Sequence, residues 1–183
     1  MMSMTSYGAK ELADAFRTVR KNTIQIANEI PEDQYGFQPA PGSRTVAQTL
    51  THIAVSCRLA EQIHMVEKRT TLDGFNFPAF FGGIAAEEQT PRSKDQIIAL
   101  LTEAGDKFGG FLAGLSNELL SERVAMPPGM QPADKSRIEM LMGVKEHEMH
   151  HRGQLMLVQR MLGQTPHLTR EMQARMASMQ AKS

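Results

Sequence analysis

Histidine and glutamate side chains are concentrated in the segment KEHEMHHRGQ, residues 145–154. Within it, His147, Glu148 and His151 form the pattern H-E-x-x-H. Residues four apart on a helix lie on one face, separated by about 6 Å, so two imidazoles at this spacing can bind one metal ion at about 2.1 Å. This pair predicts only part of a metal site, because a catalytic metal typically has three protein ligands and one open position.

The direction of each side chain follows from a helical wheel of about 100° per residue. With His147 placed at 0°, the apolar face of the segment centres at about 65° and His151 lies at about 40°. His150 lies at about 300°, outside that face, whereas Glu148 lies at about 100°. We therefore predict that His147, Glu148 and His151 point inward and that His150 does not.

The third metal ligand is expected on an earlier helix. His52 lies beside Ile53 in an apolar stretch, so its side chain can point into the protein interior. On a regular helix Cys57 and His64 lie about 140° and 120° around from His52, which makes both poor co-ligands. A single inward histidine is more often an ordinary core residue, but three inward histidines, two of them one turn apart, favour a metal site.

Composition restricts the classes of function. The chain has 183 residues, 41% of them hydrophobic, and 20 basic residues balance 20 acidic ones, which indicates a single domain, 1–183, with no nucleic acid or membrane partner. It shows no signal peptide and no run of about 20 apolar residues, so we expect a cytoplasmic protein. Cys57 is the single cysteine, which excludes an intrachain disulfide and a cysteine-cluster zinc site.

Four stretches with helical spacing of apolar residues predict an all-α four-helix bundle. Capping boxes at Thr45, Ser93 and Ser136 mark the starts of the second, third and fourth helices. The predicted helices cover residues 12–30, 45–67, 93–115 and 136–162.

A short additional helix is predicted after the bundle core, which spans about 8–166. It covers about 167–181 and has an apolar side that either packs on the bundle or contacts another subunit. The connections 68–92 and 118–135 are predicted to be long loops. The phenylalanine-rich part, 72–84, either caps the end of the bundle or shapes a pocket.

The segments RTVAQTLTHIAVS and HEMHHRGQL, each on the helix where it is expected, together resemble the DinB-like superfamily of metal-binding four-helix-bundle proteins. The resemblance spans about residues 8–166. It implies that His52, His147 and His151 bind a divalent ion, zinc or nickel, with open coordination positions. It also implies a homodimer and, as in some relatives, the use of a low-molecular-weight thiol as co-substrate.

The predicted function is a metal-dependent enzyme that activates a low-molecular-weight thiol or water against a small-molecule substrate. Three neutral imidazoles leave the charge of the ion intact, so a bound thiol or water would lose its proton near neutral pH. Glu148 is expected to accept the free ring N–H of a ligand histidine or to act as the catalytic base. Arg152 and Gln154 are either ordinary surface and packing residues or substrate contacts.

Two alternatives compete with this enzyme. In the first, the metal only stabilises the bundle or is sensed by it, without catalysis. In the second, H-E-x-x-H belongs to a zinc peptidase with Glu148 as base and Glu171 as third ligand. Gly163 and Pro166 interrupt the chain before Glu171, and the sequence has no signal for the strands that bind peptide substrates, so the peptidase is disfavoured.

Overall fold

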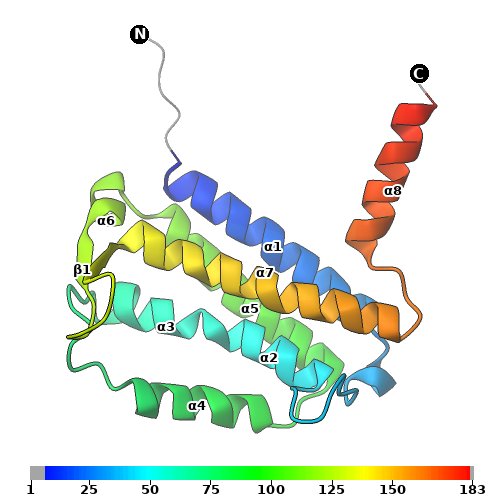
Figure 1. Ribbon diagram of the computed structural model, residues 1–183, viewed down its shortest axis with the longest axis horizontal. Coiled ribbons are helices and arrows are strands. Elements are labelled where there is room, and N and C mark those ends of the chain that lie inside the picture. Colours follow the sequence, from blue (N-terminus) through cyan, green and yellow to red (C-terminus); the bar gives the residue numbers. More distant parts are fainter. Residues whose placement is uncertain (1–6, 182–183) are drawn as a thin grey trace.

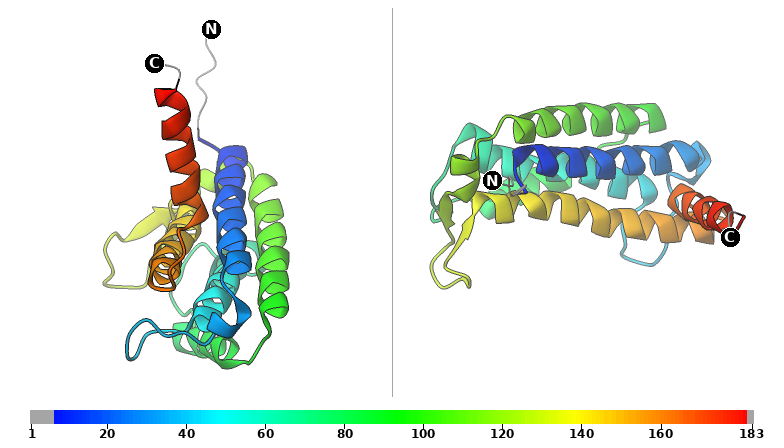
Figure 2. Two further views of the ribbon diagram at one scale, coloured as in Figure 1. Left: turned by 90° about the vertical axis from the view of Figure 1, so that its right-hand side faces the viewer. Right: turned by 90° about the horizontal axis from the view of Figure 1, so that it is seen from above.

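The computed structural model describes residues 7–181, and four long helical segments form an all-α bundle within it (Figure 1). Two views at right angles show three of these segments, α1, α5 and α7, running alongside one another (Figure 2). The bundle helices are α1 (Ala9–Glu29), α2 (Val46–Ser56) with its continuation, α5 (Lys94–Ala113) and α7 (Arg137–Met161). Within the described residues, no helix is long and apolar enough to span a membrane.

The starts of three bundle helices agree with the predicted capping boxes. The Thr45 hydroxyl accepts a hydrogen bond from the backbone N–H of Gln48, and the Gln48 side chain accepts one from the backbone of Thr45. Reciprocal pairs of the same kind begin α5 at Ser93 and α7 at Ser136. The cap at Ser136 fixes the first residue of α7, the helix that carries His147 and His151.

The second bundle helix is less regular than the sequence predicted. It reaches the expected length, but its hydrogen bonding changes at Cys57. A short α-helical turn, α3 (Arg58–Ala60), follows, and then a π-helix, η2 (Glu61–Val66). A π-helix has a wider turn than an α-helix, so side chains beyond Cys57 point in directions that a regular helical wheel does not give.

Both predicted long loops contain secondary structure, which corrects the sequence interpretation. The phenylalanine-rich segment forms α4 (Phe77–Gln89), which packs on α2 outside the bundle. The connection 118–135 contains α6 (Asn117–Ser121) and an antiparallel pair of strands, β1 (Arg123–Ala125) and β2 (Asp134–Ser136). The sequence interpretation missed α4 because two glycines, Gly82 and Gly83, lie in the middle of it. Asn76 at the N-cap and Pro78 in the first turn are nevertheless typical helix start signals.

Besides a small cluster of Ile63, Leu72 and Val124, the core of the described residues has two large apolar clusters along the bundle axis. One cluster includes Ile26, Leu101 and Leu155, and the other includes Phe16 and Phe108, whose rings pack edge to face. The positions of Arg20 on α1 and Glu148 on α7 fall between the two clusters. The core is therefore divided by a buried polar contact.

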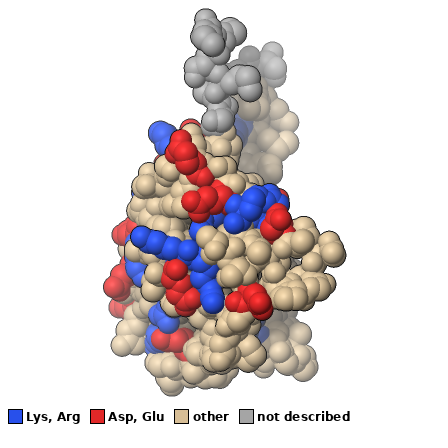
Figure 3. All heavy atoms as spheres, turned by 90° about the vertical axis from the view of Figure 1, so that its left-hand side faces the viewer, with Lys and Arg blue, Asp and Glu red and all other residues tan. Residues whose placement is uncertain are grey.

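The predicted C-terminal helix is α8 (His167–Gln180), which projects away from the bundle (Figures 1 and 2). Met172, Met176 and Met179 are all exposed, so its apolar side does not cover the bundle in the way that the sequence allowed. Acidic and basic side chains are interspersed at the end of the bundle that carries α6 and β1 (Figure 3). This mixture agrees with the zero net charge of the chain.

Candidate metal centre

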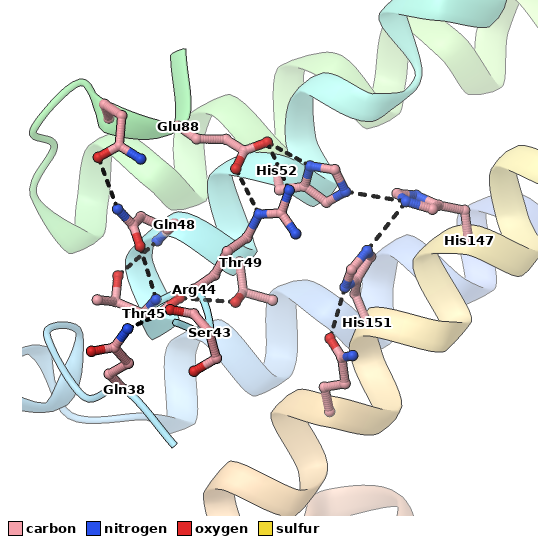
Figure 4. Close-up of polar contacts among 12 residues, drawn as sticks. Gln38, Ser43, Arg44, Thr45, Gln48, Thr49, His52, Glu88, His147 and His151 are labelled. Atoms are coloured by element: carbon pink, nitrogen blue, oxygen red, sulfur yellow. Dashed lines mark hydrogen bonds and ion pairs between the residues drawn. The ribbon is translucent and has the colours of Figure 1, made fainter. Parts of the chain in front are cut away.

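Three histidines from two bundle helices converge on one point. His52 comes from α2, and His147 and His151 come from consecutive turns of α7 (Figure 4). The Nε2 atom of His147 lies 3.1 Å from Nε2 of His52 and 3.2 Å from Nε2 of His151. Ligands about 2.1 Å from one ion are separated by about 3.0 Å at a right angle and about 3.4 Å at a tetrahedral angle, so the spacing fits a shared ion.

The opposite ring nitrogens of two histidines contact acceptor oxygens. Nδ1 of His52 lies 2.7 Å from Oε1 of Glu88, and Nδ1 of His151 lies 2.8 Å from Oε1 of Gln154. Because a carboxylate and an amide oxygen only accept, each Nδ1 carries the hydrogen and each Nε2 presents a lone pair. Lone pairs directed at one point are the arrangement that a metal ion requires.

The surroundings of the cluster favour neutral imidazoles. Burial lowers the pKa of His52 and His151, and the hydrogen bonds that these rings donate to Glu88 and Gln154 oppose this only in part. Burial, followed by the neighbouring histidines, lowers the pKa of His147 to about 4. All three rings are therefore neutral near pH 7, which is the protonation state that binds metal.

Glu88 is a site residue that the sequence interpretation missed. Its carboxylate contacts His52 and also accepts a hydrogen bond from Nε of Arg44 at 2.6 Å. Burial alone would raise the pKa of Glu88, but the bonds from Arg44 and His52 outweigh it and lower the pKa. The anionic carboxylate fixes the His52 ring, and it escaped notice because its helix, α4, was read as a loop.

Glu148 occupies a different environment from the one predicted. Its side chain is fully buried, and its hydrogen bonds in the described structure come from Arg20, at 3.0–3.1 Å. Arg20 also donates to the carbonyl oxygens of Leu101 and Ile53. The predicted hydrogen bond between Glu148 and a ligand histidine is therefore wrong, because a buried carboxylate takes the cation that faces it across the core.

Other residues of the sequence prediction lie outside the cluster. His150 is exposed, as the helical wheel indicated. Arg152 is half-buried, and its Nε has no hydrogen-bond partner in the part of the chain that is described. Burial raises the pKa of Cys57 to about 11, which leaves this thiol protonated and unreactive at neutral pH. Glu171 lies exposed on α8, so neither this residue nor Glu148 occupies the position that a zinc peptidase requires.

Two hollows adjoin the histidine cluster. The first is a cavity of about 620 Å³ with many polar lining groups, among them Arg44, Glu88, His151 and Gln154. The second, of about 350 Å³, is mainly apolar and begins at His52 and His147. An ion at the cluster would be reachable from both sides, as a site with open coordination positions must be.

The model of the DinB superfamily matches residues 15–155. The chain belongs to the DinB superfamily. The match covers α2 and α5 in full, most of α1 and α7, and all three histidines, and it ends before α8.

Individual DinB relatives share the fold at low sequence identity. The uncharacterized protein YjoA of Bacillus subtilis (strain 168) is 22% identical over 159 residues, which cover 86% of this chain and 92% of YjoA. The crystal structure of YjoA, a DinB-like protein, superposes with a TM-score of 0.62 at 21% identity over 85% of this chain and 94% of YjoA.

A second DinB structure, YfiT from Bacillus subtilis, has a TM-score of 0.67 at 15% identity and covers 90% of this chain and 93% of its own. YfiT is described as a probable metal-dependent hydrolase with an unusual four-helix bundle topology. These similarities establish the four-helix bundle for this chain.

Proposed function

We propose that this DinB-superfamily protein is a divalent-metal-dependent enzyme of the hydrolase or thiol S-transferase type. His52, His147 and His151 are the proposed ligands, and zinc or nickel is the proposed ion. The observation that carries the proposal is the hydrogen bonding of His52 and His151 at Nδ1, which turns both Nε2 lone pairs toward Nε2 of His147. The description of YfiT as a probable metal-dependent hydrolase supports it.

A divalent ion held by three neutral imidazoles would lower the pKa of a bound water or thiol toward neutrality. Arg44 and Glu88 then have distinct tasks. Glu88 keeps the His52 ring in its ligand orientation. Arg44 brings a positive charge into the polar hollow beside His151, where it can bind an anionic group of a substrate or co-substrate.

Proton transfer is left to the solvent or to the substrate in this scheme. Glu148 is engaged by Arg20 and so does not act as the base. The Cys57 thiol, buried and protonated, does not act as a nucleophile. The reaction therefore depends on the nucleophile that the metal activates and on the substrate that the two hollows accept.

The proposal is tested with protein reconstituted with zinc or nickel. Hydrolysis is followed with p-nitrophenyl esters, and thiol transfer is followed with cysteine or glutathione and an aryl halide. We expect turnover that a chelator abolishes, that metal restores, that is lost in His151→Ala and that is retained in the control Glu171→Ala.

Two results would count against this function. Turnover that persists unchanged in His151→Ala would place the chemistry elsewhere. A protein that binds one metal ion through these histidines but turns over neither class of substrate would support the non-catalytic alternative, in which the metal stabilises the bundle.

A further inference from the structure

The apolar cavity of about 350 Å³ runs along the second bundle helix between α4 and α7. At one end are the metal-centre residues His52 and His147, and at the other is His64. His52 and His64 are separated by twelve positions, or about 18 Å of helix. The walls between them include Leu59, Ile63, Phe80, Phe81, Ile84 and Val144.

His64 brings a directed polar group to this apolar cavity. The residue is only 4% exposed, and its Nδ1 lies 2.9 Å from Nη1 of Arg137. A guanidinium only donates, so Nδ1 is the acceptor and Nε2 carries the ring hydrogen. Burial, together with Arg137, lowers the pKa of His64 to about 4, so the ring is neutral at pH 7. The described residues provide no hydrogen-bond partner for Nε2.

The π-helix accounts for the position of His64. On a regular α-helix its side chain would point about 120° away from that of His52. The irregularity at Cys57 and the wide turns of η2 rotate the later side chains, and His64 lines the same cavity as His52. Segments of π-helix are frequent at functional sites.

We propose that this cavity binds an elongated apolar part of the substrate and that His64 selects its far end by donating a hydrogen bond from Nε2. The ligand class is an aryl or alkyl chain that carries an uncharged acceptor, such as a ketone or ether oxygen. A terminal ammonium group is excluded, because His64 presents a donor there and the Arg137 guanidinium bound to its Nδ1 adds positive charge behind the ring. As a statement about substrate, this inference rests on the proposed function, but the binding itself can be measured without turnover.

The test uses two probes with the same carbon skeleton, benzylacetone and butylbenzene, titrated into the full-length protein and followed by NMR. Gly143 lines the cavity, and a Cβ added there meets nothing within 4 Å, so Gly143→Leu fills the cavity. Gly110 on α5 is equally unobstructed but does not line this cavity, which makes Gly110→Leu the matched control. His64→Phe retains an aromatic ring without the N–H.

We expect both probes to bind the wild type, to bind Gly143→Leu at least about tenfold more weakly, and to bind Gly110→Leu unchanged. In His64→Phe, the preference for the ketone over the hydrocarbon should fall by about threefold to tenfold, the value of one hydrogen bond. Unchanged binding in Gly143→Leu, or an unchanged preference in His64→Phe, would overturn the proposal. If His64→Phe does not fold, the Gly143→Leu comparison still decides the location of the site.

Metal content measured on the same samples separates the two proposals. Probe binding without metal would refute the metal enzyme and leave the cavity as a binding site. One bound metal without probe binding would refute only the substrate inference.

Discussion

His147 and Glu148 are neighbours on α7, yet they belong to two regions with opposite properties. The nitrogen of His147 meets two other histidine nitrogens, which present lone pairs toward it, between two hollows. The carboxylate of Glu148 is fully buried and accepts three hydrogen bonds from Arg20. One short motif thus supplies a binding site through its histidines and a structural ion pair through its glutamate.

The comparison shows how a polar group is recognised as structural or functional. The Arg20 guanidinium also donates to Leu101 on α5 and Ile53 on α2, so the pair connects all four bundle helices. In the histidine cluster, by contrast, the chain supplies partners for the Nδ1 atoms of His52 and His151, which donate to Glu88 and Gln154. The Nε2 lone pairs of these two rings point toward Nε2 of His147 and meet no other donor within the described residues. A group whose partners are all supplied by the chain supports the fold, and a group whose free lone pairs converge is ready for a ligand.

The largest expected effect concerns the ion pair. Glu148→Gln leaves the Arg20 charge buried without its counter-ion, so the free energy of unfolding should fall by about 3–5 kcal/mol in a denaturant titration. The double variant Arg20→Met with Glu148→Leu should recover most of that loss, because an apolar pair removes both charges. A Glu148→Gln variant of wild-type stability but without activity would instead assign Glu148 to the site.

The histidine cluster should respond to pH in the way expected of lowered pKa values. Protons compete with metal, so the metal affinity is present above the pKa of each ligand and is lost as the pH falls through it. Since burial lowers all three pKa values, the loss of affinity should set in below the pH at which unperturbed histidines titrate, and His147, with its pKa lowered to about 4, should be the last ligand to be protonated. Below the pKa of a ligand, the affinity should fall by about tenfold for each pH unit.

Equilibrium dialysis at each pH, with helical content checked by circular dichroism, measures this dependence. Loss of metal centred near pH 6.5, the value of an unperturbed histidine, would show that the cluster is not shielded as the structure indicates.

Gly105 tests the packing around Arg20. A Cβ at Gly105 would lie 2.7 Å from Cγ of Arg20, so Gly105→Ala should lower the free energy of unfolding by about 1–3 kcal/mol. On the same helix, nothing lies within 4 Å of a Cβ at Gly110, and Gly110→Ala should raise stability by about 0.5–1 kcal/mol. Thermal melts of the two variants compare them directly, and equal shifts would mean that the ion pair has room to move.

Glu88 is expected to have the smallest effect among the variants at the metal site. Glu88→Ala removes the acceptor that orients His52, and the metal affinity should fall by about tenfold while the fold persists. Glu87 pairs with Arg58 and Arg92 and does not contact the histidines, so Glu87→Ala is the control. Competition with a chromogenic chelator measures the metal affinity of both variants. Equal affinities would show that Glu88 does not contribute to the metal site.

Patterns within a single helix predicted much of this molecule. Capping boxes and apolar spacing located the four bundle helices, and the helical wheel correctly turned His151 inward and His150 outward. These features depend on local geometry, which is nearly the same in every α-helix. The convergence of His52 with the α7 pair could be anticipated because both lie on inward faces of the same bundle.

Features that depend on contacts between distant segments escaped prediction. The partner of Glu148 is Arg20, 128 positions away, and although Arg20 lies four residues after Phe16 on the apolar face of α1, this spacing does not reveal which residue it contacts. Glu88 was hidden because two glycines obscured its helix. The predicted direction of the His64 side chain was wrong because the sequence gives no signal for the π-helix that turns this side chain toward the cavity.

The central claim is that His52, His147 and His151 bind one divalent metal ion. It is tested most directly by plasma mass spectrometry of metal content in protein purified without a histidine tag, for the wild type, His52→Ala, His151→Ala and Glu171→Ala at matched helical content. We expect about one equivalent of metal in the wild type and in Glu171→Ala and almost none in either histidine variant. A wild type that remains free of metal after incubation with zinc and nickel, or histidine variants that retain metal, would show that these histidines do not form a metal site.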